Sequence, residues 1–217
     1  MKWLTNFFNT SVGRKQLMAL SGLGLAGFLV IHLSGNFLLF AQDGGKLFQA
    51  YADWLKEQPW LNAARAGLLG TLVLHLYLAF QLDSQNRKAR QTDYHYKAPS
   101  DATLASRSMI LTGILILVFV ILHLIHFTWA DHDVPGGLYG LVVAKFTHPV
   151  WSIFYIVSML VLGGHLIHAI QSVFQTFGLR HAKYSQIIKA LCMGLAAGLT
   201  VGFMSIPLFF LITKGGV

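Results

Sequence analysis

The residues in this sequence best able to do chemistry are histidines that lie inside apolar segments. The 217-residue chain contains ten histidines. Six of them fall within long apolar runs: His32, His75, His123, His126, His165 and His168. A single histidine on an apolar face is usually a hydrogen-bonded core residue, but polar groups spread over several hydrocarbon-embedded segments usually mark function. Neutral imidazole is a common axial ligand of haem iron, so we interpret these histidines as candidate haem ligands.

The composition indicates which elements must hold these histidines in place. Hydrophobic residues make up 55% of the chain and charged residues only 11%, whereas a soluble domain has about 25% charged residues. A membrane-spanning helix requires about 20 apolar residues. Five such runs occur, at about residues 17–40, 66–82, 109–129, 150–174 and 187–212. We predict an all-α integral membrane bundle of five transmembrane helices, a single domain over residues 1–217, in which an amphipathic segment over 51–64 leads into the second helix.

The distribution of lysine and arginine predicts the orientation of these helices. The segment before the first run and the loops after the second and fourth runs together hold eleven of the sixteen basic residues, but only three of the eight acidic ones. Basic residues concentrate on the cytoplasmic side of membrane proteins. The sequence therefore predicts a cytoplasmic N-terminus and an external C-terminus. In a membrane protein the net charge of +8 is explained by topology, and we expect no nucleic-acid partner.

The depth of the histidines along the predicted helices divides four of them into two pairs. At about 1.5 Å per residue, His32 and His123 lie about 22 and 21 Å from the inner ends of their spans. His75 and His165 lie about 10 and 14 Å from the inner ends of theirs. The sequence thus predicts an outer pair and an inner pair, roughly 10 Å apart in depth. Two ligands at matched depth on different helices suit one haem, so two pairs suit two haems stacked across the membrane.

The third and fourth spans each carry a second histidine, His126 and His168, three residues after the first and on the same helical face. Spacing alone does not decide which member of each pair binds iron. The surplus histidines could bond a haem propionate, contact a quinone or satisfy backbone groups. A zinc or copper site would require several ligands at one depth with carboxylate or thiolate help, so haem is favoured.

Four stretches of the sequence carry a family resemblance. They are HLSGN from His32 to Asn36, LHLYLAFQL from Leu74 to Leu82, TGILILVFVILHLIHFTW from Thr112 to Trp129, and FYIVSMLVLGGHLIHAIQSVFQTFGLR from Phe154 to Arg180. In this order they resemble the cytochrome b membrane-anchor subunit of succinate dehydrogenase and fumarate reductase, in its single-polypeptide, dihaem, five-helix class. The resemblance covers residues 11–213.

The resemblance implies which histidines are axial ligands. Matching the TG-x9-H and FYIV-x7-H patterns of the family selects His123 and His165, and the ligands of the first two helices fall on His32 and His75. The implied pairing of helices agrees with the pairing by depth. Some dihaem fumarate reductases carry a glutamate near the fourth-helix ligand, proposed to belong to a proton path. Here Gly163 and Gly164 precede the histidine, which argues against such a path.

The resemblance also implies the cofactors and partners. It implies two haems b and a quinone substrate, menaquinone by our interpretation, in a complex in the bacterial cytoplasmic membrane. A flavoprotein subunit and an iron–sulfur subunit would dock on the cytoplasmic face. The chain has no dinucleotide-binding fingerprint, and its single cysteine, Cys192, cannot hold an iron–sulfur cluster, so succinate chemistry must come from those subunits. The chain would anchor the enzyme in lipid and transfer electrons to or from quinone.

Other residues could serve the quinone or the haem propionates. Quinone chemistry requires a proton donor or acceptor beside a carbonyl, and Asp53, Glu57 or His132 could supply it on the outer side, although these could equally be solvated loop residues. The basic residues Arg14, Arg107 and Arg180 could pair with propionates or with the partner subunit, or could serve only lipid head groups and topology.

Three other functions would also place histidines in apolar helices. A dihaem cytochrome b of a hydrogenase or formate dehydrogenase explains the histidines equally well, but not the HLSGN and FQTFGL stretches. A channel or transporter that relays protons would require a continuous polar path, which the sequence lacks. A purely structural anchor leaves four depth-matched histidines unexplained.

Overall fold

The computed structural model describes residues 7, 10–88, 108–179, 181 and 183–215. All regular elements in these residues are helical. Five helical segments are long and apolar enough to cross a membrane, at Ser11–Phe40, Leu61–Lys88, Met109–Thr128, Pro149–Thr176 and Ser185–Thr213. The predicted all-α bundle of five membrane helices is therefore confirmed. Arg107 and Arg180, named above as candidates for propionate or partner contacts, lie outside the described residues.

Among the described residues, five long α-helices form the spans, and two of them are continued by short segments of tighter or wider helix. The long helices are α2 (Ser11–Asn36), α4 (Leu61–Lys88), α6 (Met109–His123), α8 (Pro149–Thr176) and α9 (Ser185–Thr213). A 3₁₀ segment, Phe37–Phe40, continues α2, and a π-helical segment, Leu124–Thr128, continues α6. Thr10 caps α2 by accepting a hydrogen bond from the Gly13 amide at 3.0 Å. Pro149 starts α8 at the first turn, where a missing N–H costs nothing.

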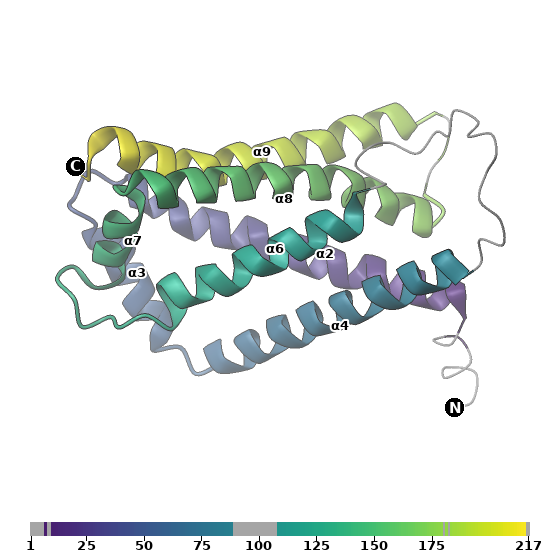
Figure 1. The fold of residues 1–217 in the computed structure, drawn as a ribbon, viewed down its shortest axis with the longest axis horizontal. Coiled ribbons are helices and arrows are strands. Elements are labelled where there is room, and N and C mark those ends of the chain that lie inside the picture. Colours follow the sequence, from purple (N-terminus) through teal and green to yellow (C-terminus); the bar gives the residue numbers. More distant parts are fainter. Residues whose placement is uncertain (1–6, 8–9, 89–107, 180, 182, 216–217) are drawn as a thin grey trace.

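Two short helices differ from the sequence-based expectation. The amphipathic segment expected over 51–64 is divided: α3 (Lys46–Lys56) ends before the turn that leads into α4. Helix α7 (Gly137–Phe146), between α6 and α8, was not predicted. Both short helices begin after a glycine with positive φ, Gly45 at 81° and Gly136 at 80°, where a side chain would be strained. They lie together at the end of the bundle where α9 ends (Figure 1).

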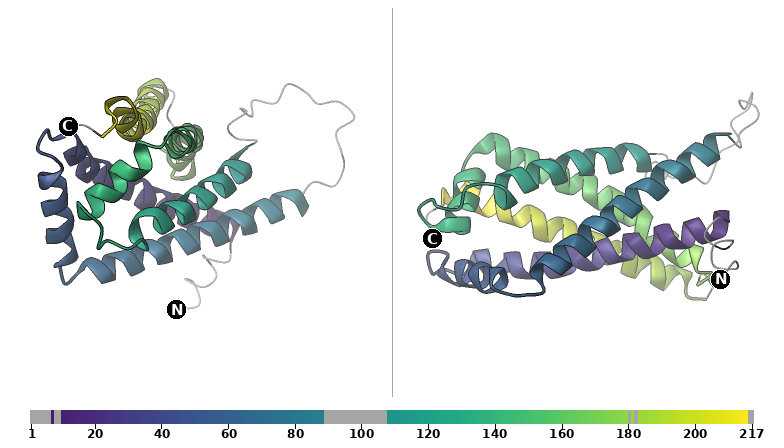
Figure 2. Two further views of the ribbon diagram at one scale, coloured as in Figure 1. Left: turned by 60° about the vertical axis from the view of Figure 1, so that its left-hand side comes forward. Right: turned by 90° about the horizontal axis from the view of Figure 1, so that it is seen from below.

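The four helices that carry histidines form a four-helix unit, with α9 packed outside it. Helix α2 packs along α4 and α8, and α6 packs along α8 and touches α4. Helices α2 and α6 are therefore diagonal to one another, as are α4 and α8. Helix α9 packs on α8 and α2 (Figures 1 and 2). The histidine-bearing faces of diagonal helices can thus meet only across the centre of the unit.

The helices differ greatly in how much of their surface the chain itself covers. In the most apolar stretch of α8, 39% of the residues are buried, against 6% in α4 and 6% in the span that contains α6. Large apolar side chains such as Leu69, Leu111 and Val150 are at least 60% exposed, as expected for helices that face lipid. Trp54, Trp60 and Trp129 are also exposed at the end of the bundle that holds α3 and α7, which suits a membrane interface.

A tight contact between α8 and α9 depends on a glycine. A Cβ atom added to Gly163 would collide with the side chain of Thr200 on α9, whereas a Cβ added to the adjacent Gly164 would meet nothing within 4 Å. Thr200 is itself buried and donates to the carbonyl of Ala196 at 2.7 Å, so it cannot easily move away. Small residues at such crossings let helices approach closely.

We expect Gly163→Ala to destabilise the purified protein by about 1–3 kcal/mol, because overpacking of a tight contact costs that much. Gly164→Ala is the matched control and should be neutral or slightly stabilising, since alanine favours a helix over glycine by about 1 kcal/mol. Thermal unfolding in detergent measures both. The double variant Gly163→Ala with Thr200→Ala should recover most of the loss, and equal effects of the two single glycine variants would contradict the assigned contact.

Candidate functional site

The outer pair of histidines meets at the centre of the four-helix unit. The ring of His32 on α2 lies 5.8 Å from the ring of His123 on α6, centre to centre, with the ring planes at 86°. Phe28 stacks on His32 at 5.3 Å, and Phe203 of α9 lies 5.8 Å from it. The Nδ1 atom of His123 is buried and has no hydrogen-bond partner in the described part of the chain. A buried nitrogen without a protein partner is rare and requires an explanation, such as a ligand.

The inner histidines are each held by a hydroxyl group from a different helix. Nδ1 of His75 on α4 lies 3.1 Å from Oγ of Ser21 on α2. Nδ1 of His165 on α8 lies 3.1 Å from Oγ1 of Thr112 on α6. The helices that supply the outer histidines therefore also supply the hydroxyls of the inner pair.

On α2 and on α6, the same number of residues separates the hydroxyl that contacts an inner histidine from the outer histidine. Ser21 lies eleven residues before His32, and Thr112 lies eleven residues before His123. Eleven residues correspond to about 16 Å along a helix. This separation in depth is larger than the roughly 10 Å expected from the ends of the predicted spans. The predicted ends gave an inaccurate reference for depth, because the helices extend beyond them by different amounts. Helix α4, for example, continues to Lys88, six residues beyond the expected end.

The structure separates His123 from His126. In the π-helical turn, Nδ1 of His126 lies 3.1 Å from the hydroxyl of Tyr155, and its ring meets Trp151 edge-on at 4.4 Å. His126 is 7% exposed, so it is a buried polar side chain with a partner of its own. His123, one turn away, contacts His32 instead. The Tyr155 ring lies near both imidazoles, 6.1 Å from His123 and 6.0 Å from His126, so the two histidines differ in their partners although they share this neighbour.

His168 and Arg14 lie towards the end of the bundle where α2 starts. His168 is half-buried, one turn of α8 beyond His165. Arg14 is half-buried near the start of α2, about two turns before Ser21. Both residues therefore lie beyond the inner pair on the side away from His32 and His123.

Asp53 on α3 has a structural role at the end of the bundle that holds α3 and α7. Its two carboxylate oxygens accept hydrogen bonds from Nε2 of Gln49 at 2.9 and 3.0 Å, and Nζ of Lys56 lies 3.6 Å from one of them. Oε1 of the same glutamine accepts from the backbone N–H of Tyr139 at 3.2 Å. Asp53 therefore orients the side chain that ties α3 to α7.

His132 also has a local partner, whereas Glu57 is exposed at the end of α3. Nε2 of His132 donates to the carbonyl of Phe127 at 2.8 Å and closes the loop that follows the π-helical turn. The structure therefore shows local contacts for two of the three residues suggested for a quinone and no common site for all three among the described residues.

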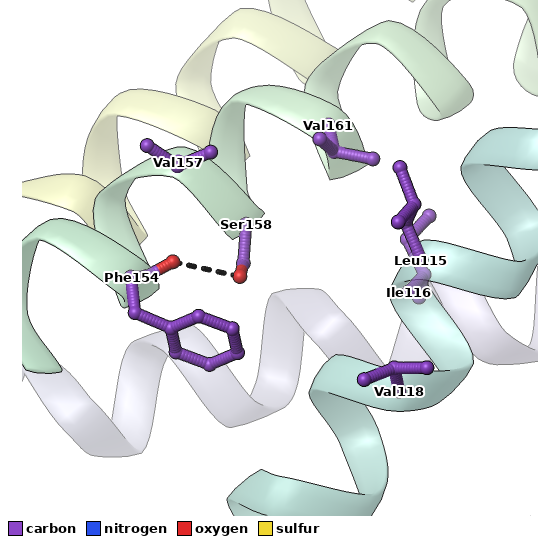
Figure 3. A pocket seen from close by; sticks show the side chains of 7 residues that line it. All are labelled: Leu115, Ile116, Val118, Phe154, Val157, Ser158 and Val161. Carbon is purple, nitrogen blue, oxygen red and sulfur yellow. Dashed lines mark hydrogen bonds between the residues drawn. The ribbon is translucent and has the colours of Figure 1, made fainter.

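A groove of about 300 Å³ lies between α6 and α8 (Figure 3). Its walls are apolar except for Ser158, whose hydroxyl donates to the carbonyl of Phe154 at 2.7 Å. The groove offers no titratable group to a reacting quinone. It suits a lipid acyl chain better than a quinone head group.

Comparison with known protein families decides the identity of this histidine-bearing bundle. The model of the family described as succinate dehydrogenase/fumarate reductase transmembrane subunit matches residues 83–202. The chain belongs to this family. No match was found among curated proteins or among solved structures. The expectation from the sequence stretches is therefore confirmed at the level of the family, for a membrane subunit of an oxidoreductase complex.

The match to the transmembrane-subunit family covers α6, α8 and part of α9, and therefore His123 and His165. His32 and His75 lie outside the matched residues. The structure supplies their relation to the matched half, because His32 contacts His123 and His75 is bonded to the helix that carries His32. The whole histidine arrangement thus depends on both halves of the chain.

The donor set of this transmembrane subunit fits haem, the group that the family binds. A metal–imidazole bond is about 2 Å long, so two imidazoles on one iron have ring centres about 6 Å apart, close to the 5.8 Å of the outer pair. Among the described residues no three metal-binding side chains converge, as a zinc or copper site would require. His32 and His123 face each other as two imidazoles, which is the number that two axial ligands require.

Sequence reasoning missed the hydroxyls of Ser21 and Thr112 and the phenol of Tyr155. A signal for the first two was present, since the pattern of a hydroxyl residue, a glycine, nine residues and a histidine occurs at 21–32 and again at 112–123. Tyr155 had no such signal, because its partner His126 is brought to it by a change in helical pitch.

Proposed function

We propose that this chain is the dihaem cytochrome b anchor of a succinate:quinone oxidoreductase in a bacterial cytoplasmic membrane. In this proposal His32 and His123 are the axial ligands of an outer haem b, and His75 and His165 those of an inner haem b. A flavoprotein and an iron–sulfur subunit bind on the cytoplasmic face, and the membrane substrate is menaquinone. The chain belongs to the family of such transmembrane subunits.

One observation carries the haem proposal. Imidazoles from diagonal helices face each other across the bundle, with His32 and His123 5.8 Å apart, and a second set of imidazoles is bonded to the same two helices eleven residues earlier. A core that served packing alone would bury apolar side chains here, because unpaired polar groups in hydrocarbon are costly. Two haems, when bound, would supply one-electron carriers between the cytoplasmic partner and the quinone.

The residues of the chain then have distinct tasks. The four axial histidines hold two irons at different depths, and the aromatic rings of Phe28 and Phe203 keep water from His32. His126, with its Tyr155 partner, and His168 and Arg14 on the inner side are available to propionates or quinone. Dry surroundings strengthen every electrostatic interaction at such a site.

The proposal predicts the haem content of the purified complex. A dithionite-reduced minus oxidised spectrum, together with a pyridine haemochrome assay, should give two haems b per chain. A colourless complex that still contains both partner subunits would overturn the haem proposal and leave only a membrane anchor.

We also propose that the end of the bundle where α2 starts faces the cytoplasm, because basic residues gather there. Among the described residues they include Arg14, Lys15, Arg87, Lys88, Lys183 and Lys189. The exposed residues Lys183 and Asp131 lie on opposite sides of the membrane in this topology. In intact cells a membrane-impermeant maleimide should label Asp131→Cys and spare Lys183→Cys. The native Cys192 is buried and should give little background, and the reverse labelling would refute the orientation.

A further inference from the structure

Helices α2 and α6 present the same short pattern to the inner histidines. Each has a hydroxyl residue, then a glycine, then nine residues and an outer histidine: Ser21, Gly22 and His32 in α2, and Thr112, Gly113 and His123 in α6. A Cβ on the glycine of α2 would contact Cε1 of His75 at 3.4 Å, and one on the glycine of α6 would contact Cε1 of His165 at 3.8 Å. On both helices the inner imidazole therefore lies next to the glycine that follows the hydroxyl residue, at a distance that would just admit a Cβ atom.

The hydrogen bonds of the two hydroxyls favour one tautomer of each inner imidazole. The Ser21 hydroxyl donates to the carbonyl of Met18 at 2.9 Å. The Thr112 hydroxyl donates to the carbonyls of Ser108 and Met109 at 3.0 and 3.1 Å. A hydroxyl has one proton to donate and two lone pairs. Because a carbonyl can only accept, all of these contacts are hydrogen bonds at once only when each hydroxyl donates to its own helix and accepts from the Nδ1–H of its imidazole. In that arrangement Nε2 carries no proton.

We propose that Ser21 and Thr112 are positioning residues of the inner haem site, which hold its two axial imidazoles as Nδ1–H tautomers and lower the midpoint potential of that haem. The inference rests on the proposed axial role of His75 and His165. An unprotonated Nε2 has the lone pair that can bind iron. A hydrogen-bond acceptor at Nδ1–H fixes the ring plane and makes the imidazole a more basic ligand. A more basic ligand favours the oxidised iron.

The outer site provides an internal contrast. Nδ1 of His123 is buried without a partner in the described chain, so this imidazole donates no comparable hydrogen bond to a hydroxyl. The two sites therefore differ in the hydrogen bonding of their ligands, a property that tunes haem potential. Removal of the Ser21 or Thr112 hydroxyl should change the midpoint potential of the inner haem and leave that of the outer haem unchanged.

The test is a redox titration of the intact purified complex, followed by optical and paramagnetic resonance spectra. Ser21→Ala and Thr112→Val remove the acceptors with little change in volume. Each should raise the midpoint potential of one haem by about 59 mV if its reduction equilibrium changes tenfold, and should change its low-spin ferric spectrum. The haem affected should be the one that a His165→Leu variant loses. Ser21→Thr and Thr112→Ser keep a hydroxyl and should keep the native potential.

Ser158→Ala is the matched control, because this intramembrane hydroxyl also donates to its own helix but lines the lipid-facing groove. It should change neither haem. Two haems with unmoved potentials and spectra in Ser21→Ala and Thr112→Val would overturn the positioning role while leaving the proposed function intact. An unmodified complex without haem would instead defeat the proposed function, and the inference with it.

Discussion

Replacement of His123 by leucine is expected to reduce the haem content of the purified complex from two per chain to one. The reason is that His123 is the α6 side chain that meets His32 across the bundle, at 5.8 Å between ring centres. Leucine fills a similar volume and leaves no buried polar group, so we expect the helices to fold and the second haem to stay. The pyridine haemochrome assay and the reduced minus oxidised spectrum measure the loss.

The matched control for this variant is His126→Leu, three residues along the same segment. Its imidazole bonds Tyr155 and packs on Trp151, so its loss should leave two haems and cost only the stability of a buried hydrogen bond, about 1–3 kcal/mol. Two haems in His123→Leu and one in His126→Leu would reverse the ligand assignment. Recovery of both variants with their partner subunits shows that the chain is folded.

Pairs of substitutions are expected to reveal which histidines share an iron. The double variant His32→Leu with His123→Leu should keep one haem, because both ligands belong to the same outer site. The double variant His32→Leu with His165→Leu should keep none, because it removes a ligand from each site. Residues that act as a unit are non-additive in this way, whereas independent sites add. Haem content per chain, measured against protein mass, gives the result.

The inner pair should behave in the same manner. His75→Leu, His165→Leu and their combination should each keep one haem, and the spectrum of the haem that stays should be the same in all three. His168→Leu is the control on α8 and should keep two haems. Loss of both haems from His75→Leu with His165→Leu would show that neighbouring rather than diagonal helices share an iron, and would refute the pairing.

The fold was predictable as far as hydropathy determines it. Five apolar runs gave five membrane helices, because a lipid-embedded backbone must satisfy its hydrogen bonds within a helix. The ends of the helices were less accurate: α2 begins at Ser11 and α4 extends to Lys88, since polar residues continue a helix into the interface. Helix α7 was missed because its ten residues are too few to span a membrane and lie in a connecting segment.

The site was predictable as a set of residue types and less so as a set of contacts. Depth along the helices proposed His32 with His123, and the structure brings their rings together. Spacing of three residues could not separate His123 from His126, because that separation depends on the π-helical turn. The contact of Thr112 with His165 depends on how α6 and α8 are rotated about their axes. Such rotation follows from packing and not from composition.

The sparse packing of α4 and α6 has a consequence for the assembly of the chain. Each has only 6% of its most apolar residues buried, yet each would contribute one ligand to an iron that is also held by a diagonal helix. Bound haem would then link α4 and α6, which make few contacts within the chain, to the better-packed α8 and α2. A ligand that binds only the folded state stabilises that state in proportion to its affinity. Shortage of haem in the growing cell would therefore limit how much of this subunit survives membrane proteolysis, before any electron is transferred.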